Sequence, residues 1–96
     1  MDFKDIRRIG VIGAGLMGHG IAQVFASAGY AVNLYDADKA TLEAAKGKIH
    51  ANFKVFIDLG LAEPKDAADC LGRITLCNSL AALCEDSQYI IEAILE

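Results

Sequence analysis

The stretch from Arg7 to Asp36 reads RRIGVIGAGLMGHGIAQVFASAGYAVNLYD and carries glycines in the spacing G-x-G-x-x-G. An alternating apolar pattern precedes these glycines, as in a strand, and an apolar residue on successive helical turns follows them. A second alternating run then ends on an acid, about 20 residues beyond the loop. The apolar residues that set these periods are Ile9, Val11, Ile21, Phe25, Val32 and Leu34. The stretch therefore predicts a strand, a tight glycine loop, a helix and a second strand.

Each of the three glycines has a distinct physical role in such a loop. Gly13 permits the tight turn out of the strand, Gly15 lets backbone approach a pyrophosphate, and Gly18 permits close packing of helix on strand. The unpaired N–H groups at the start of the helix then face the phosphate charge. Glycines that serve only a turn and helix packing are the structural alternative. We expect the pyrophosphate to lie against Gly13, Ala14, Gly15, Leu16, Met17 and Gly18.

Asp36 ends the second apolar run and predicts which dinucleotide binds. A carboxylate there can accept hydrogen bonds from the two adenosine ribose hydroxyls, and it repels a 2′-phosphate. No arginine follows it to reverse that preference. NAD is therefore the expected cofactor, rather than NADP.

Composition limits the other classes of function. A chain of 96 residues makes one small domain, and 54% hydrophobic residues implies either a well-covered sheet or partner surface that is missing. The net charge of −4 argues against a nucleic-acid partner. No apolar run approaches the roughly 18 residues of a membrane span. Both charge signs in the opening segment MDFKDIRR argue against a signal peptide, so we expect a cytoplasmic protein.

The three cysteines, Cys70, Cys77 and Cys84, are spaced by seven and form no Cys-x-x-Cys pair. No histidine stands at zinc-ligand spacing from them. We interpret them as reduced and mostly buried thiols, and we expect no metal site.

The rest of the chain alternates strands and helices, which predicts an α/β fold of Rossmann type with helices on both faces of a parallel sheet. Right-handed crossovers give the strand order 3-2-1-4. The second helix, capped by Asp38 and ended by Gly60, is long enough to project beyond the sheet. Its expected apolar face comprises Leu42, Ala45, Ile49, Phe53, Phe56 and Leu59. The expected strands are 6–12, 31–35, 74–77 and 89–93. The expected helices are 15–28, the stretch between the cap Asp38 and Gly60, 64–71 and 80–83.

The fourth strand is expected to leave a long hydrophobic edge, which natural domains avoid. A complete dinucleotide fold continues with two further strands. We therefore expect residues 1–96 to be the N-terminal part of a dinucleotide-binding domain truncated after strand 4, with a C-terminal catalytic and dimerisation domain absent. The open edge also predicts self-association into a homo-oligomer.

Three segments together resemble the NAD-binding half of the L-3-hydroxyacyl-CoA dehydrogenase family, which includes bacterial 3-hydroxybutyryl-CoA dehydrogenases. They are RIGVIGAGLMGHGIAQV from Arg8, LYD from Leu34 and IIEAILE from Ile90. The resemblance covers essentially the whole chain. It implies hydride transfer between NAD and the 3-hydroxyl of an acyl-CoA, with Ala93 and Glu96 lining the nicotinamide side. For Glu96, a solvated chain terminus is the alternative.

The resemblance also implies that a catalytic His-Glu pair, with supporting Ser and Asn residues, lies beyond Glu96. We therefore expect no catalytic residue in this chain and no activity from the chain alone. His19 is expected to face solvent or to pack beside the cofactor, and His50 to face solvent on the second helix. No acid or oxyanion donor is arranged in sequence around either histidine.

In the family, the projecting second helix contacts acyl-CoA through a small polar residue and, about two turns later, a lysine. The matching positions here hold Asn52, a candidate substrate contact, and Leu59, which cannot contact a phosphate. Lys54 is an alternative charge, although an exposed helical lysine is usually only solubilising. This departure keeps open a related carnitine or gulonate dehydrogenase. An NAD-sensing regulatory module, as in potassium channels, is a further alternative.

Overall fold

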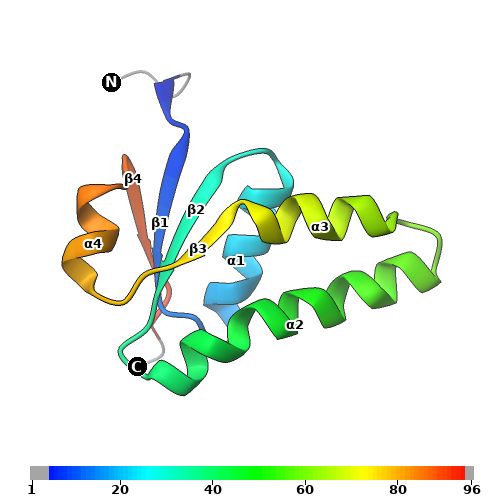
Figure 1. Ribbon diagram of the computed structural model, residues 1–96, viewed down its shortest axis with the longest axis horizontal. Coiled ribbons are helices and arrows are strands. Elements are labelled where there is room, and N and C mark those ends of the chain that lie inside the picture. Colours follow the sequence, from blue (N-terminus) through cyan, green and yellow to red (C-terminus); the bar gives the residue numbers. More distant parts are fainter. Residues whose placement is uncertain (1–4, 95–96) are drawn as a thin grey trace.

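The computed structural model describes residues 5–94, which form a four-stranded parallel sheet with four helices (Figure 1). The strand order is β3-β2-β1-β4, so the predicted α/β fold class and strand order are confirmed. In chain order the elements are β1 (Arg8–Ile12), α1 (Leu16–Ser27), β2 (Ala31–Tyr35), α2 (Lys39–Asp58), α3 (Pro64–Gly72), β3 (Ile74–Leu76), α4 (Leu80–Glu85) and β4 (Tyr89–Glu92).

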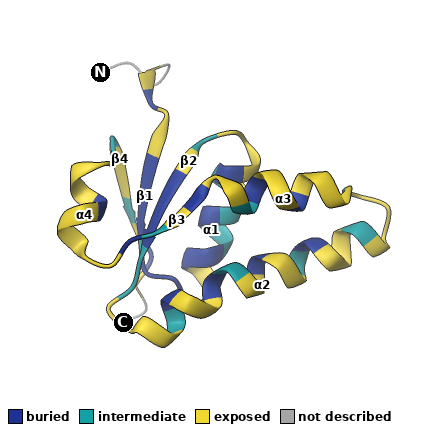
Figure 2. Cartoon of the chain, in the orientation of Figure 1, coloured by how far each residue is buried: buried dark blue, intermediate teal, exposed yellow. Residues whose placement is uncertain are grey.

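The two faces of the sheet are covered by different helices, as predicted (Figure 1). Alternate strand residues such as Val11 and Leu34 are fully buried in the main core, where α1 packs on β1 and β2. The residues between them face α4, where Gly10 leaves room for the Leu83 side chain. Burial on both faces explains why β1 carries no polar side chain from Ile9 to Ile12. Figure 2 shows the central strands as the most buried part of the chain.

Helix α2 packs chiefly on α1 and α3 and runs out beside α3 beyond the sheet, as expected from its 20 residues (Figure 1). The predicted apolar face is confirmed for its first four members, which are buried. It is wrong at the far end, where Phe56 is 40% and Leu59 is 66% exposed. These two residues lie where α2 projects, and little of the chain remains to cover them.

The ends of the helices follow the predicted capping chemistry. Gly29 and Gly60 follow α1 and α2 with φ of 102° and 75°, a region that favours glycine. The Asp38 carboxylate accepts the Ala40 N–H at 3.2 Å and so caps α2. Ser79 caps α4 in the same way, but α4 continues to Glu85, beyond the predicted end at Leu83.

Strand β1 begins at Arg8, later than the predicted start at Ile6. The side-chain oxygen of Gln88 accepts the backbone N–H groups of Arg7 and Arg8 at 2.7 and 3.0 Å. On the β4 side of β1, the Gln88 side chain thus makes the hydrogen bonds that a paired strand would make. Pairing of β1 with β4 starts only at Ile9 and Tyr89.

Within residues 5–94, β4 pairs with β1 alone, so its outer edge is open. Tyr89 and Ile90 on this strand are 50% and 40% exposed. In the same part of the chain, no helix is both long and apolar enough to cross a membrane.

Candidate dinucleotide site at the glycine loop

The register of the sheet brings three separate segments together at the carboxyl ends of the strands. Ile12 at the end of β1 lies opposite Tyr35 of β2 and Glu92 of β4. The residues that follow, Gly13, Asp36 and Ala93, therefore line one cavity of about 550 Å³. Crevices at this edge, where the chain crosses from one half of the sheet to the other, are where α/β folds bind nucleotides.

The three glycines are needed here for three different reasons. Gly13 has φ of 107°, and a side-chain carbon there would approach the Ala93 carbonyl oxygen to 2.6 Å. A side-chain carbon on Gly18 would overlap the Gly13 carbonyl group, so α1 packs on the turn only because Gly18 lacks one. A side-chain carbon on Gly15 would meet nothing within 4 Å, and Gly15 lines the cavity. Gly13 and Gly18 thus serve the turn and packing, whereas Gly15 leaves room for a ligand.

The start of α1 supplies donors to this open space. Gly15 is the N-cap residue and makes no side-chain cap bond to the N–H groups of the first turn, which also contains no acid. The first N–H groups of a helix have no intrahelical acceptor and carry the positive end of the helix dipole. A pyrophosphate fits this arrangement of open space and free donors.

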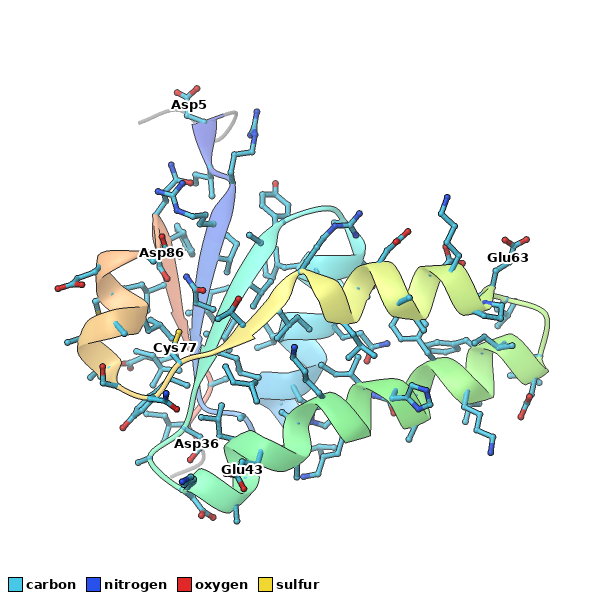
Figure 3. All side chains as sticks on the ribbon, in the orientation of Figure 1. Asp5, Asp36, Glu43, Glu63, Cys77 and Asp86 are labelled. Atoms are coloured by element: carbon cyan, nitrogen blue, oxygen red, sulfur yellow. The ribbon has the colours of Figure 1, made fainter. Side chains whose placement is uncertain are left out.

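Asp36 lies at the carboxyl end of β2, beside the glycine loop (Figure 3). One carboxylate oxygen accepts the Ala14 N–H at 2.8 Å, and the other accepts the Asp38 N–H at 2.7 Å. These bonds fix the carboxylate in the lining of the cavity and connect it to the glycine loop. Each oxygen retains acceptor capacity for a ribose hydroxyl, since a carboxylate offers about four lone-pair sites.

Most of the predicted loop residues reach the cavity. Leu16 and Met17 line it and are 81% and 58% exposed, whereas Ala14 and Gly18 are buried behind it. Ala93 lines the cavity with 6% exposure. Glu96, the other residue expected on the nicotinamide side, lies outside the described residues.

Several residues that line the cavity were not predicted from the sequence. They are Ile12, Tyr35, Ala37, Thr41, Leu80 and Ile94. Apart from Thr41 and Leu80, each flanks a residue already expected at a strand end, so strand ends alone would have indicated them. Thr41 and Leu80 lie in the first turns of α2 and α4, and only the folded chain brings them together.

The two histidines occupy different environments. His19 is only 5% exposed, and its Nδ1 lies 2.7 Å from the Gly15 carbonyl oxygen. The solvent-facing alternative for His19 is therefore wrong, because the side chain folds back onto the start of its own helix. His50 is exposed on α2, as predicted.

Asn52, the candidate substrate contact, is half-buried on α2, and its side-chain amide donates to Gln23 Oε1 at 3.0 Å. Gln23 lines a second cavity of about 530 Å³, which Phe53 and Phe56 also line. Asn52 is thus held by α1 and is not among the residues that line the glycine-loop cavity. Lys54 and Leu59 are both exposed.

The cysteines carry no bond to one another. Cys70 and Cys77 are buried and Cys84 is exposed, and all three are free thiols. Burial raises the pKa of the Cys77 thiol, and the nearby negative charge of Asp86 raises it further. Cys77 therefore has little thiolate character.

Comparisons with known proteins show which family the chain is similar to. Residues 8–96 match the family model described as 3-hydroxyacyl-CoA dehydrogenase, NAD binding domain. A 3-hydroxybutyryl-CoA dehydrogenase from Mycobacterium tuberculosis is 35% identical over 91 residues, which are 95% of this chain and 32% of that protein.

Solved structures show the same relationship. The (S)-3-hydroxybutyryl-CoA dehydrogenase PaaH1 from Ralstonia eutropha superposes with a TM-score of 0.89 at 32% identity, over 96% of this chain and 32% of that one. A diketoreductase that acts on dicarbonyl compounds superposes with a TM-score of 0.82 at 33% identity, over 95% and 32%. The chain thus spans about a third of the length of these relatives. By its glycine loop, its sheet order and its match to the family model, the chain belongs to the family of NAD-binding domains of 3-hydroxyacyl-CoA dehydrogenases.

Proposed function

We propose that this chain is the cofactor-binding portion of an NAD-dependent 3-hydroxyacyl-CoA dehydrogenase. The whole protein would move a hydride between NAD and the 3-hydroxyl of an acyl-CoA in the cytoplasm. The observation that carries the proposal is the cavity in which the open Gly15 backbone, the start of α1 and the Asp36 carboxylate meet. NAD, when bound, supplies the hydride acceptor.

Each part of the cavity has a proposed task in holding NAD. The loop from Gly13 to Gly18 would contact the pyrophosphate through backbone N–H groups. Asp36 would accept the adenosine ribose hydroxyls and disfavour a 2′-phosphate. Ala93 and Glu96 would line the nicotinamide side. Asn52 is a proposed contact for the acyl-CoA, made from helix α2, which projects beyond the sheet (the α2 arm).

We propose that residues 1–96 are inactive alone, and that a C-terminal domain of the whole protein supplies catalysis and dimerisation. His19 is buried against Gly15, and exposed His50 lies on the α2 arm; neither lines the glycine-loop cavity. Neither is therefore placed to act as a general base on a substrate held there.

A second candidate is a related dehydrogenase with a different substrate, such as carnitine or gulonate. Leu59 favours it, because an exposed leucine stands where the family carries a lysine. The similarity to a diketoreductase agrees with a broader range of carbonyl substrates. An NAD-sensing regulatory module is the third candidate, and the long α2 arm argues against it.

The test is calorimetric titration of the purified chain with NAD and with NADP, followed by an assay of NADH consumption with acetoacetyl-CoA. The proposal predicts binding of NAD, weaker binding of NADP and no turnover. Asp36→Ala should weaken NAD binding, whereas Asp58→Ala, which removes an exposed carboxylate from α2, should not. Equal affinities for the two dinucleotides would contradict the role of Asp36, and turnover would contradict the assignment of catalysis to another domain.

A further inference from the structure

His19 is a histidine in an unusual position, because it is almost fully buried in the first turns of the helix that faces the cavity. Its exposure is 5%, and it packs next to the loop rather than into the cavity. The Gly15 carbonyl oxygen lies 2.7 Å from His19 Nδ1 and also accepts the His19 backbone N–H at 3.0 Å. Both donors to the Gly15 carbonyl thus come from one residue.

The tautomer of His19 follows from this geometry. A carbonyl oxygen only accepts hydrogen bonds, so Nδ1 must carry the proton. In the neutral ring Nε2 is then unprotonated. A side chain that served only to fill space would not require this tautomer.

Holding the Gly15 carbonyl also sets the direction of the next N–H group. The peptide unit is planar and trans, so the Gly15 carbonyl and the Leu16 N–H point in opposite directions within one rigid plane. Leu16 is the first residue of α1 and lines the cavity, and its N–H has no acceptor within the helix. Whatever holds the carbonyl therefore also aims this donor.

The Gly13–Ala14 peptide unit, two units earlier in the loop, is held by other groups. The Ala14 N–H donates to Asp36, and the Gly13 carbonyl packs against Gly18. The Gly15–Leu16 unit is held through the Gly15 carbonyl by the two donors of His19, its backbone N–H and Nδ1. On the other side of Gly15 the loop is open, since a side-chain carbon there would meet nothing within 4 Å. A glycine in open space is flexible, and ordering it on binding would reduce affinity.

We propose that His19 is a positioning residue for the pyrophosphate: its Nδ1–H holds the Gly15 carbonyl and so aims the Leu16 N–H into the cavity before NAD arrives. The inference rests on the proposed function, because it assumes that NAD occupies this cavity. It assigns to His19 no contact with substrate and no role in proton transfer.

Three variants test the affinity prediction. His19→Leu removes the donor, His19→Asn restores a side-chain N–H at the position of Nδ1, and His50→Leu is a matched control at an exposed histidine. His19→Leu should bind NAD about 3- to 10-fold more weakly, the effect of losing about one hydrogen bond. His19→Asn should bind within about twofold of the unmodified chain. Equal NAD affinity in His19→Leu would overturn the proposal, as would a loss in His19→Asn as large as in His19→Leu.

Nuclear magnetic resonance supplies readouts that do not depend on cofactor binding. At about pH 8.5, long-range proton–nitrogen spectra should show the Nδ1–H tautomer for His19. His19→Leu should also lower the ¹⁵N order parameters of Gly15 and Leu16, and His50→Leu should not.

The possible failures are distinguishable. If the unmodified chain does not bind NAD, the proposed function fails, and the tautomer and order parameters still decide whether His19 holds the loop. An Nε2–H tautomer, or order parameters unchanged in His19→Leu, would overturn the inference even if NAD binds. If His19→Leu does not fold, the tautomer of the unmodified chain and the affinity of His19→Asn provide the test.

Discussion

Replacing Gly18 by alanine should destabilise the chain, whereas the same replacement at Gly20 should stabilise it. Both glycines lie within α1, two residues apart. A side-chain carbon at Gly18 would overlap the backbone carbonyl of Gly13, and a backbone atom cannot rotate away as a side chain can. A side-chain carbon at Gly20 would meet nothing within 4 Å. The two sites therefore share helix propensity and differ only in their surroundings.

The magnitudes follow from two opposing terms. Alanine is favoured over glycine inside a helix by about 0.8–1 kcal/mol, and this gain applies at both sites. Forcing extra volume into a packed region costs about 1–3 kcal/mol or more, and the Gly13 turn is further held by the bond from Ala14 to Asp36. Because the overlap at Gly18 is with backbone, we take the upper end of this cost and subtract the propensity gain; Gly18→Ala should then lower the free energy of unfolding by about 2 kcal/mol or more, and Gly20→Ala should raise it by up to about 1 kcal/mol.

The assay is urea unfolding followed by circular dichroism, with thermal midpoints as a second measure. For a domain of this size, about 1 kcal/mol corresponds to a shift of about 4–8 °C. Gly18→Ala should also weaken NAD binding, because α1 must move away from the turn, and Gly20→Ala should not. Stabilisation by both alanines would show that α1 does not pack on Gly13 as described, and the geometry of the loop would then be wrong.

Three further predictions concern other parts of the chain. Asp36→Asn should weaken NAD binding by about tenfold or more, because hydrogen bonds to a charged group contribute about that much affinity. It should also reduce the ratio of NAD affinity to NADP affinity. An unchanged ratio by calorimetry would contradict the role of Asp36. Cys77 should react with iodoacetamide more slowly than exposed Cys84 at mildly alkaline pH, because burial and Asp86 raise the pKa of the Cys77 thiol. Mass spectrometry of the labelled peptides measures the two rates, and faster labelling of Cys77 would refute the prediction. The open edge of β4 predicts self-association, and a monomer by sedimentation at tens of micromolar would count against it.

Local sequence patterns predicted the fold because local chemistry and tertiary packing agree in this chain. Alternating apolar residues that end at Gly13 and at Asp36 predicted the first two strands. In the parallel register of the sheet, the carboxyl ends of these two strands lie side by side. Glycines with positive φ ended α1 and α2 where predicted. The role of Gly18 was also predictable, since it packs on Gly13, which is close in sequence, whereas the approach of Ala93 to Gly13 depends on the distant strand β4.

Features that depend on partners distant in sequence were not predictable. The start of β1 is set by Gln88, about 80 residues away, which replaces part of the ladder. The burial of Asn33 depends on bonds from its amide to Asp86 and Ser87 in the turn before β4. Leu59 is exposed because α2 extends beyond the elements that pack on it. The periodic pattern of that helix does not indicate how far it extends.

The central claim is that NAD occupies the cavity between the glycine loop, Asp36 and Ala93. Mapping the backbone amide shifts of the labelled chain during titration with NAD tests this most directly. We expect the largest shifts on the loop from Gly13 to Gly18, on Asp36 and on Ala93. Shifts concentrated instead on Gln23 and the residues around the second cavity, or no saturable shifts at all, would contradict it.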